Sequence, residues 1–301
     1  MASASAPERI LQRLDWHVVR RLDGLLQGDY DSLFRGGGLD FASLREYEFG
    51  DDVRSIDWNV TARMTTPYVR EFLEDREITA WFLLDLSPSL DYGTAADGRD
   101  KRAVLVDFVA TLARILTRRG NRVAAIVRGG DAVATIPAGS GRMQVLRLVD
   151  QLLAEPRLER APFTDLGPLL EAAHRRIRRR SLVVLISDFI GVPGWERSLE
   201  LLNRRHELLA VRVVDPREVT LPDVGPVILR DAETGEQLYV DTGDARFRAR
   251  FQAAAEARDT SVRAALGRAR VDAVTLSTED DLVRAIVRMS LERRRRRGRP
   301  A

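Results

Sequence analysis

The sequence contains no cysteine and only three histidines among its 301 residues. Without cysteine, the chain forms no disulfide bond and offers no thiolate for zinc binding or for catalysis. The histidines lack the spacing of a metal site; they are His17, His174 and His206. No apolar run reaches the roughly 18–20 residues that a membrane helix needs, and the first residues lack the layout of a signal peptide. We therefore expect a folded cytoplasmic protein.

Neither basic nor acidic residues are in marked excess. The chain has 48 basic and 45 acidic residues, so its net charge is only +3, which is not typical of a nucleic-acid-binding protein. The clearest basic block lies at the end, in residues 293–297 and Arg299. Such a run is usually a solvated tail after a helix, and the alternative is that it binds nucleic acid or an anionic surface. The triple glycine at 36–38 lacks the Gly-Lys-Ser/Thr ending of a phosphate-binding loop.

Short apolar runs alternate with segments of helical periodicity along most of the chain. Runs of four to eight apolar residues predict strands buried on both faces, as in a parallel sheet. The predicted strands are 69–72, 78–84, 123–127, 133–136, 182–186, 208–214 and 271–276, and the first two are joined near residues 74–76. Predicted helices are 8–27, 102–118, 143–153, 164–177, 195–204, 245–268 and 280–293. The pattern predicts an α/β protein with a mainly parallel, Rossmann-like sheet flanked by helices.

Three parts are expected from this pattern. Residues 1–78 form an N-terminal helix and a mixed-charge extension that pack on the main domain, which spans 79–293. Residues 294–301 form a basic tail. Within the main domain, residues 215–243 interrupt the alternation, and two apolar runs flank Thr234-Gly235 there. This spacing predicts a β-hairpin insertion.

Oxygen-bearing side chains follow two of the predicted strands. The run that ends at Leu84 is followed by Asp85, Ser87 and Ser89, and residues 182–186 are followed by Asp188. Thr164 lies near a predicted helix start, as capping residues do. The carboxyl ends of parallel strands meet at one edge of a sheet, where ligands bind. Hard oxygen ligands favour Mg²⁺ most, with Mn²⁺ or Ca²⁺ as alternatives, and Mg²⁺ leaves room for an outside ligand.

These residues resemble a known metal site. Asp85-Leu86-Ser87-Pro88-Ser89, with Thr164 and Asp188, is similar to the metal-ion-dependent adhesion site (MIDAS) of von Willebrand factor A domains. Upstream, 44–47, 50–54 and 56–58 resemble the signature of the bacterial domain of unknown function 58 family. The resemblance covers residues 30–215 and implies a von Willebrand factor A-like fold with a MoxR-type AAA+ ATPase as partner. Family members often carry N-terminal membrane helices, which this sequence lacks.

The mixed-charge segment before the main domain combines both charges with glycine and aromatic residues. Such a mixture is typical of a hydrogen-bonded network or a docking surface, and the alternative is an acidic, metal-dependent hydrolytic site. We name these residues the signature cluster: Arg45, Glu46, Tyr47, Gly50, Asp51, Asp52, Arg54, Asp57 and Trp58.

The sequence predicts a non-enzymatic interaction module without catalytic residues. A divalent cation held by the five MIDAS-like residues would accept an Asp or Glu carboxylate from a partner. The resemblance suggests an adaptor of a MoxR-type ATPase in the assembly or maturation of other proteins. The alternative is a Mg²⁺-dependent phosphohydrolase that uses Asp85, with Asp188 as a second metal ligand. No histidine, lysine or second carboxylate is expected beside Asp85, and we attribute the single lysine, Lys101, to composition bias.

Overall fold

The computed structural model describes residues 5–25, 43–49, 51, 53, 56–64, 66–71, 78–130, 132–158 and 164–297. Contacts within the chain divide it into two compact units, residues 1–33 with 78–301 and residues 34–77. Among the described residues, the smaller unit contains a two-stranded sheet, and the larger unit contains a six-stranded sheet and a second two-stranded sheet. The domain boundaries expected from the sequence stay a prediction.

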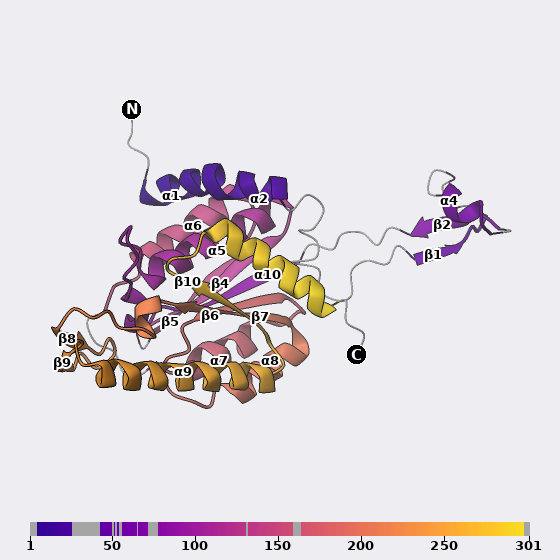
Figure 1. Cartoon of the computed structure of the whole chain (residues 1–301). Helices are drawn as coiled ribbons and strands as arrows, with labels where there is room; N and C mark the ends of the chain where they lie inside the picture. The colour runs from indigo at the N-terminus through magenta and orange to yellow at the C-terminus, as the bar shows by residue number, and fades with distance from the viewer. Residues whose placement is uncertain are drawn as a thin grey trace. The chain divides into compact units, whose positions relative to one another are not determined.

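A six-stranded sheet forms the centre of the larger unit (Figure 1). Its strand order is β10-β7-β6-β3-β4-β5, and all neighbours are parallel except β4 and β5. The strands are β3 (Thr79–Asp85), β4 (Arg122–Gly129), β5 (Ala132–Gly139), β6 (Leu182–Ser187), β7 (Glu207–Val214) and β10 (Asp272–Ser277). This topology confirms the predicted α/β class with a mainly parallel sheet.

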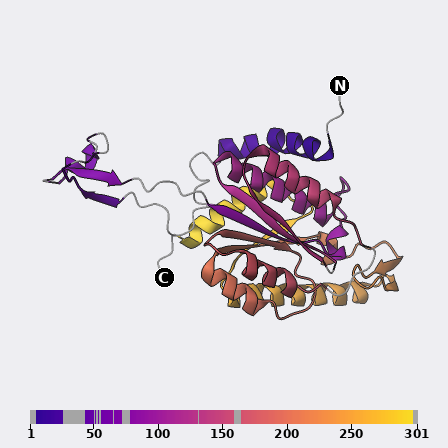
Figure 2. The same ribbon diagram turned by 180° about the vertical axis from the view of Figure 1, so that it is seen from behind.

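Helices cover both faces of this sheet, as the two opposite views show (Figures 1 and 2). One face carries α1 (Ala6–Leu14), α2 (Arg20–Leu25), α5 (Lys101–Arg118), α6 (Gly141–Ala154) and α10 (Leu282–Arg297). The other carries α7 (Gly167–Arg176), α8 (Glu196–Arg205) and α9 (Ala245–Arg268). Strand β6 is buried at every position because helices cover it on both sides, which explains why its sequence is a continuous apolar run.

The N-terminal helix belongs to the larger unit. Ser5 and Glu8 form a capping box at its start, and a π-helical turn at Asp15–Val19 joins α1 to α2. Ion pairs connect it to α5: Arg13 lies 2.5 Å from Asp107, and Arg114 lies 3.0 Å from Asp15. Among the described residues, no helix is long and apolar enough to cross a membrane.

The strand order reverses between β3 and β6. From β3 the chain passes through α5 to β4 on one side, whereas β6, β7 and β10 follow one another on the other side. Right-handed crossovers in opposite directions place α5 and α8 on opposite faces, and ligands of such sheets normally bind at the carboxyl ends of the two strands between them, here β3 and β6. Any ligand site of this sheet is therefore expected outside Asp85 and Ser187, the last residues of these strands.

The predicted hairpin insertion is confirmed. Strands β8 (Pro226–Arg230) and β9 (Gln237–Asp241) pair antiparallel between β7 and α9. Their large apolar side chains Ile228, Leu238 and Tyr239 are exposed.

The smaller unit contains β1 (Ser43–Glu46), α4 (Trp58–Thr61) and β2 (Tyr68–Glu71). The sequence analysis joined the strand at 69–72 to that at 78–84 through a turn at 74–76, which lies outside the described residues. Both strands form, but β2 pairs with β1, whereas β3 has β4 and β6 as its neighbours. Because both edges of β3 are occupied, β2 has no free edge of that strand to pair with.

The last helix extends further into the basic block than expected. Helix α10 continues to Arg297, and Arg293 is buried, where it forms ion pairs with Glu207 and Asp272. Arg293 is therefore a structural residue rather than part of a solvated tail, and binding of anions by the arginines that follow it stays a prediction.

Leu185, a fully buried residue of β6, tests the core. We expect Leu185→Ala to lower the free energy of unfolding by about 2–5 kcal/mol, because it removes buried methyl groups and leaves a cavity. The control is Leu201→Ala in α8, whose side chain is exposed; we expect less than about 1 kcal/mol there. Urea unfolding monitored by circular dichroism measures both, and equal losses would contradict this placement of the core.

Candidate functional site

The loop after β3 gathers three of the predicted ligands. Asp85 ends the strand, and Ser87 and Ser89 lie at the 3-10 turn Pro88–Asp91. The backbone N–H of Ser87 donates to Asp85 Oδ1 (3.1 Å), and the hydroxyl oxygens of Ser87 and Ser89 lie 3.1 Å apart. All three residues are buried. The Asp-x-Ser-x-Ser spacing thus forms one compact group of oxygen atoms.

The end of β6 lies beside this group, as the parallel pairing requires. Ser187 donates its hydroxyl to Asp85 Oδ2 (2.6 Å), and the backbone N–H of Ile190 donates to Asp188 Oδ1 (3.0 Å). Burial, and then the nearby charge of Asp188, raise the pKa of Asp85 to about 6. The two carboxylates therefore repel each other in a site from which water is largely excluded. Ser187 was missed by the sequence analysis, although it directly precedes Asp188.

Thr164 joins the same edge from the loop before α7. It is buried, but it does not cap the helix, because Leu166 occupies the N-cap position. Its backbone oxygen accepts a hydrogen bond from Val192 (2.8 Å), and a Cβ on Gly191 would lie only 2.1 Å from that oxygen. Glycine at 191 thus lets the loop after β6 pass close to Thr164. The capping role expected for Thr164 is wrong, and its hydroxyl instead points to the site.

The single lysine of the chain is part of this edge. Lys101 begins α5, is 0% exposed, and donates from Nζ to Asp188 Oδ2 (2.7 Å) and Glu218 Oε1 (2.5 Å). Burial lowers the pKa of Lys101, but the charges and hydrogen bonds of the two carboxylates outweigh it and raise the pKa, so the ammonium stays charged. Attributing Lys101 to composition bias was therefore wrong, because its ammonium group binds the carboxylate of Asp188 at this edge.

The acceptor Glu218 is held by the loop after β7. It ends the 3-10 turn Pro216–Glu218, and its Oε2 accepts the backbone N–H of Asp215 (2.9 Å). Asp215 also accepts hydroxyl hydrogen bonds from Thr94 (2.6 Å) and Thr278 (2.8 Å). These contacts tie the ends of β7 and β10 to the loop after β3.

Glu233, in the connection of the β8–β9 hairpin, is a further site residue that the sequence analysis missed. It is buried, and its Oε1 accepts the Thr164 hydroxyl (2.8 Å). Burial raises the pKa of Glu233, hydrogen bonding by Thr164 and Ser89 opposes this rise, and the charge of Asp188 adds to it. No local signal marks Glu233, because an acidic residue in a polar hairpin turn normally faces solvent.

The donor set of this edge fits a hard divalent cation. Asp85, Asp188 and Glu233 carry negative charge, and Lys101 divides its single positive charge between Asp188 and Glu218. A dication would offset this excess of negative charge. Within the described ranges, no three His, Cys, Asp or Glu side chains form a metal-binding cluster. A cation here would therefore be held by serine and threonine hydroxyls, with the carboxylates acting directly or through water.

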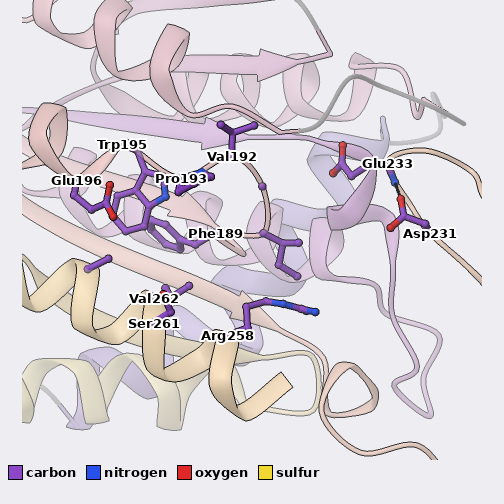
Figure 3. A pocket seen from close by; sticks show the side chains of 13 residues that line it. Phe189, Val192, Pro193, Trp195, Glu196, Asp231, Glu233, Arg258, Ser261 and Val262 are labelled. Atoms are coloured by element: carbon purple, nitrogen blue, oxygen red, sulfur yellow. Dashed lines mark hydrogen bonds between the residues drawn. The ribbon is translucent and has the colours of Figure 1, made fainter. Parts of the chain in front are cut away.

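A cavity of about 510 Å³ adjoins the site (Figure 3). Its wall is mainly apolar near Phe189 and Trp195, whose ring centroids are 5.1 Å apart. Glu233, Asp231 and Arg258 also line it. Glu233 therefore both contacts the site and lines the cavity.

In the smaller unit, part of the signature cluster forms an ordered network. Arg45 makes two hydrogen bonds to the carboxylate of Asp51 (2.6 and 2.7 Å), and this guanidinium lowers the pKa of Asp51. Asp57 Oδ1 accepts the backbone N–H of Val60 (3.2 Å), and Trp58 is exposed. Three members of the cluster, Gly50, Asp52 and Arg54, lie outside the described residues.

The sheet, its two helical layers and the oxygen donors at its switch point define an α/β domain of the kind predicted. Similar solved structures include BatB from Bacteroides thetaiotaomicron, with 15% identity, a TM-score of 0.46, and coverage of 72% of this chain and 99% of that chain. They also include the SpRpn10 VWA domain, with 14% identity, a TM-score of 0.37, and coverage of 70% and 95% respectively.

The chain belongs to the family described as "Protein of unknown function DUF58", whose model matches residues 43–261. This finding confirms the family resemblance of the signature motifs. The uncharacterized protein Rv1480 of Mycobacterium tuberculosis is 38% identical over 287 residues, which cover 95% of this chain and 89% of the relative. The uncharacterized protein MAV169 of Mycobacterium avium is 40% identical over 160 residues, which cover 53% of this chain and 94% of the relative.

The first prediction for the site concerns the stability that depends on the buried pair of Lys101 and Asp188. Lys101→Met leaves the Asp188 carboxylate buried without its ammonium partner, and we expect the free energy of unfolding to fall by about 3–5 kcal/mol. Arg175→Met is the control, because it removes a cation of an exposed pair with Glu171, which is worth less than about 1 kcal/mol. Chemical denaturation measures both variants, and a loss of the same size in each would contradict the importance of burial.

The second prediction concerns Asp85 and the pH dependence of stability, measured in a chelating buffer. Its pKa rises from 3.8 to about 6 on folding, so the native state binds more protons than the unfolded state between these values. Stability contributed by protonated Asp85 is therefore lost as the pH rises through about 6. Asp85→Asn removes this dependence, so the unfolding free energy of the variant should rise relative to that of the wild type by roughly 2 kcal/mol between pH 4 and pH 7. Urea unfolding across this range checks it; a difference that does not change with pH contradicts the raised pKa.

Proposed function

We propose that this protein is an interaction module that binds an acidic side chain of a partner protein through a divalent cation, most simply Mg²⁺. Asp85, Ser87, Ser89, Thr164 and Asp188 would hold the cation. The supporting observation is their arrangement: five buried residues from three loops lie at the switch point of one sheet, with more negative than positive charge around them. An open coordination position would then accept the partner's carboxylate.

The residues around the five ligands would keep them in place. Ser187 holds one oxygen of Asp85, and the backbone N–H of Ser87 holds the other, so the carboxylate has a fixed orientation. Lys101 orients Asp188 in the same way. Because these orienting bonds already exist in the folded protein, cation binding would need little rearrangement of side chains.

A phosphohydrolase mechanism is less favoured by the geometry. A nucleophilic carboxylate needs an oxygen that can reach the substrate. Both oxygens of Asp85 accept hydrogen bonds from the protein, and the residue is completely buried. We therefore propose binding without turnover and assign no catalytic residue.

The partner that we propose is an AAA+ ATPase of the MoxR type in the cytoplasm, with this protein as its adaptor in the assembly or maturation of other proteins. This choice is based on the resemblance of the signature motifs to their family, and the cation site supplies the chemistry: it would accept an aspartate or glutamate of the ATPase or of a client protein.

A pull-down with the purified MoxR-type ATPase from the same genome tests this proposal. We expect Mg²⁺-dependent recovery of the ATPase that falls at least tenfold with chelator or with Asp85→Ala, because the bridging cation is lost. Asp150→Asn, an exposed carboxylate on α6, is the control and should leave recovery unchanged. Equal recovery with Mg²⁺, with chelator and with Asp85→Ala would overturn the cation bridge.

A further inference from the structure

The β8–β9 hairpin reverses the usual distribution of polar and apolar side chains. Its strand residues Ile228 and Tyr239 are 62% and 72% exposed, whereas the acidic Glu233 at its end is only 5% exposed. Burying a carboxylate while large apolar groups stay in water is unfavourable unless the carboxylate gains a strong interaction. The buried position of Glu233 therefore requires a strong, specific interaction for its carboxylate.

The contacts of Glu233 show where the group that interacts with its carboxylate would lie. Its Oε1 accepts the hydroxyl of Thr164 (2.8 Å), and Ser89 lowers its pKa by hydrogen bonding. Its Oε2 is buried and has no hydrogen bond of standard geometry within the described part of the chain. Glu233 therefore lies beside Thr164 and Ser89, two of the five proposed ligands. One of its carboxylate oxygens, Oε2, has no hydrogen-bond partner among the described residues.

The turn around Glu233 fixes its direction. Asp231 Oδ1 accepts the backbone N–H groups of Glu233 (3.0 Å) and Thr234 (2.7 Å), and the backbone oxygen of Asp231 accepts the N–H of Gly235 (2.9 Å). The connection is therefore an ordered turn that presents one carboxylate to the site.

The charges around Glu233 also favour a cation at this position. The carboxylate of Asp188 acts on it with like charge, and the one ammonium at this edge, Lys101, donates to Asp188 and Glu218 rather than to Glu233. A buried carboxylate with an unpartnered oxygen beside a second carboxylate is stabilised by a cation between them.

We infer that Glu233 is an internal ligand of the proposed cation and that it occupies the coordination position which a partner's carboxylate would take. This inference rests on the proposed function. It adds that the site is closed by the chain's own hairpin, and that an acidic partner binds by displacing Glu233. Because Glu233 also lines the 510 Å³ cavity, space adjoins this residue.

Cation affinity measured with Mn²⁺ by electron paramagnetic resonance tests the inference. We expect Glu233→Gln, which keeps the shape of the side chain, and Glu233→Ala to weaken Mn²⁺ binding by at least about tenfold, as loss of a ligand requires. Glu236→Gln is the matched control, because Glu236 lies three residues further along the same turn and is exposed. Circular dichroism establishes that each variant is folded.

Acetate provides the decisive arm of the experiment. If Glu233→Ala vacates a ligand position, added acetate should restore its Mn²⁺ affinity toward the wild-type value, whereas it should not rescue Asp85→Ala, in which a different position is lost. Wild-type protein should show no gain with acetate, because Glu233 already fills the position.

The outcomes separate this inference from the proposed function. If Mn²⁺ binds the wild type and is lost in Asp85→Ala, but Glu233→Gln and Glu233→Ala bind it as tightly as Glu236→Gln, the cation site stands and the internal ligand is overturned. If weakened Glu233→Ala is not rescued by acetate, Glu233 supports the hairpin rather than ligating the cation, and the inference fails as well. No Mn²⁺ binding by the wild type contradicts both proposals.

Discussion

The ion pair between Lys101 and Asp188 is the interaction on which the functional edge depends. It joins the first residue of α5 to the residue after β6, across the point where the strand order reverses. Neither charged group is exposed, so burying either one without the other would cost folding free energy. Glu218 extends the pair to the loop after β7. The edge at which such a topology normally binds a ligand is therefore held together by buried charges.

The site brings together acidic groups that destabilise one another. Asp85 and Asp188 repel each other, and the hydroxyl of Ser187 compensates only part of that cost. Glu233 adds a third carboxylate from a segment outside the central sheet. If a cation binds here as we propose, its occupancy would control whether the hairpin stays docked. In that case, binding of a metal, docking of the hairpin and access for a partner would be coupled through the same few oxygen atoms.

The sequence predicted what depends on local pattern. Apolar runs ending in carboxylates located β3 and β6, and parallel pairing then required Asp85 and Asp188 to share one edge. Lys101 and Glu233 could not be found this way, because their site contacts span 87 and 69 residues of sequence. Arg293 was similarly misassigned to a solvated block, since its partners Glu207 and Asp272 lie on other elements. Periodicity shows which face of an element is buried, but it does not reveal which distant charge that face meets.

The isolation of Lys101 has a consequence for the surface chemistry of the protein. Arginine supplies every other basic side chain of the 48, so the only side-chain amine of the sequence is enclosed between two carboxylates. Guanidinium groups do not act as amine nucleophiles at neutral pH, because they stay protonated. Acylating reagents and enzymes that modify lysine therefore meet no side-chain amine on the native fold, and reaction at Lys101 would report that the edge of the sheet has opened.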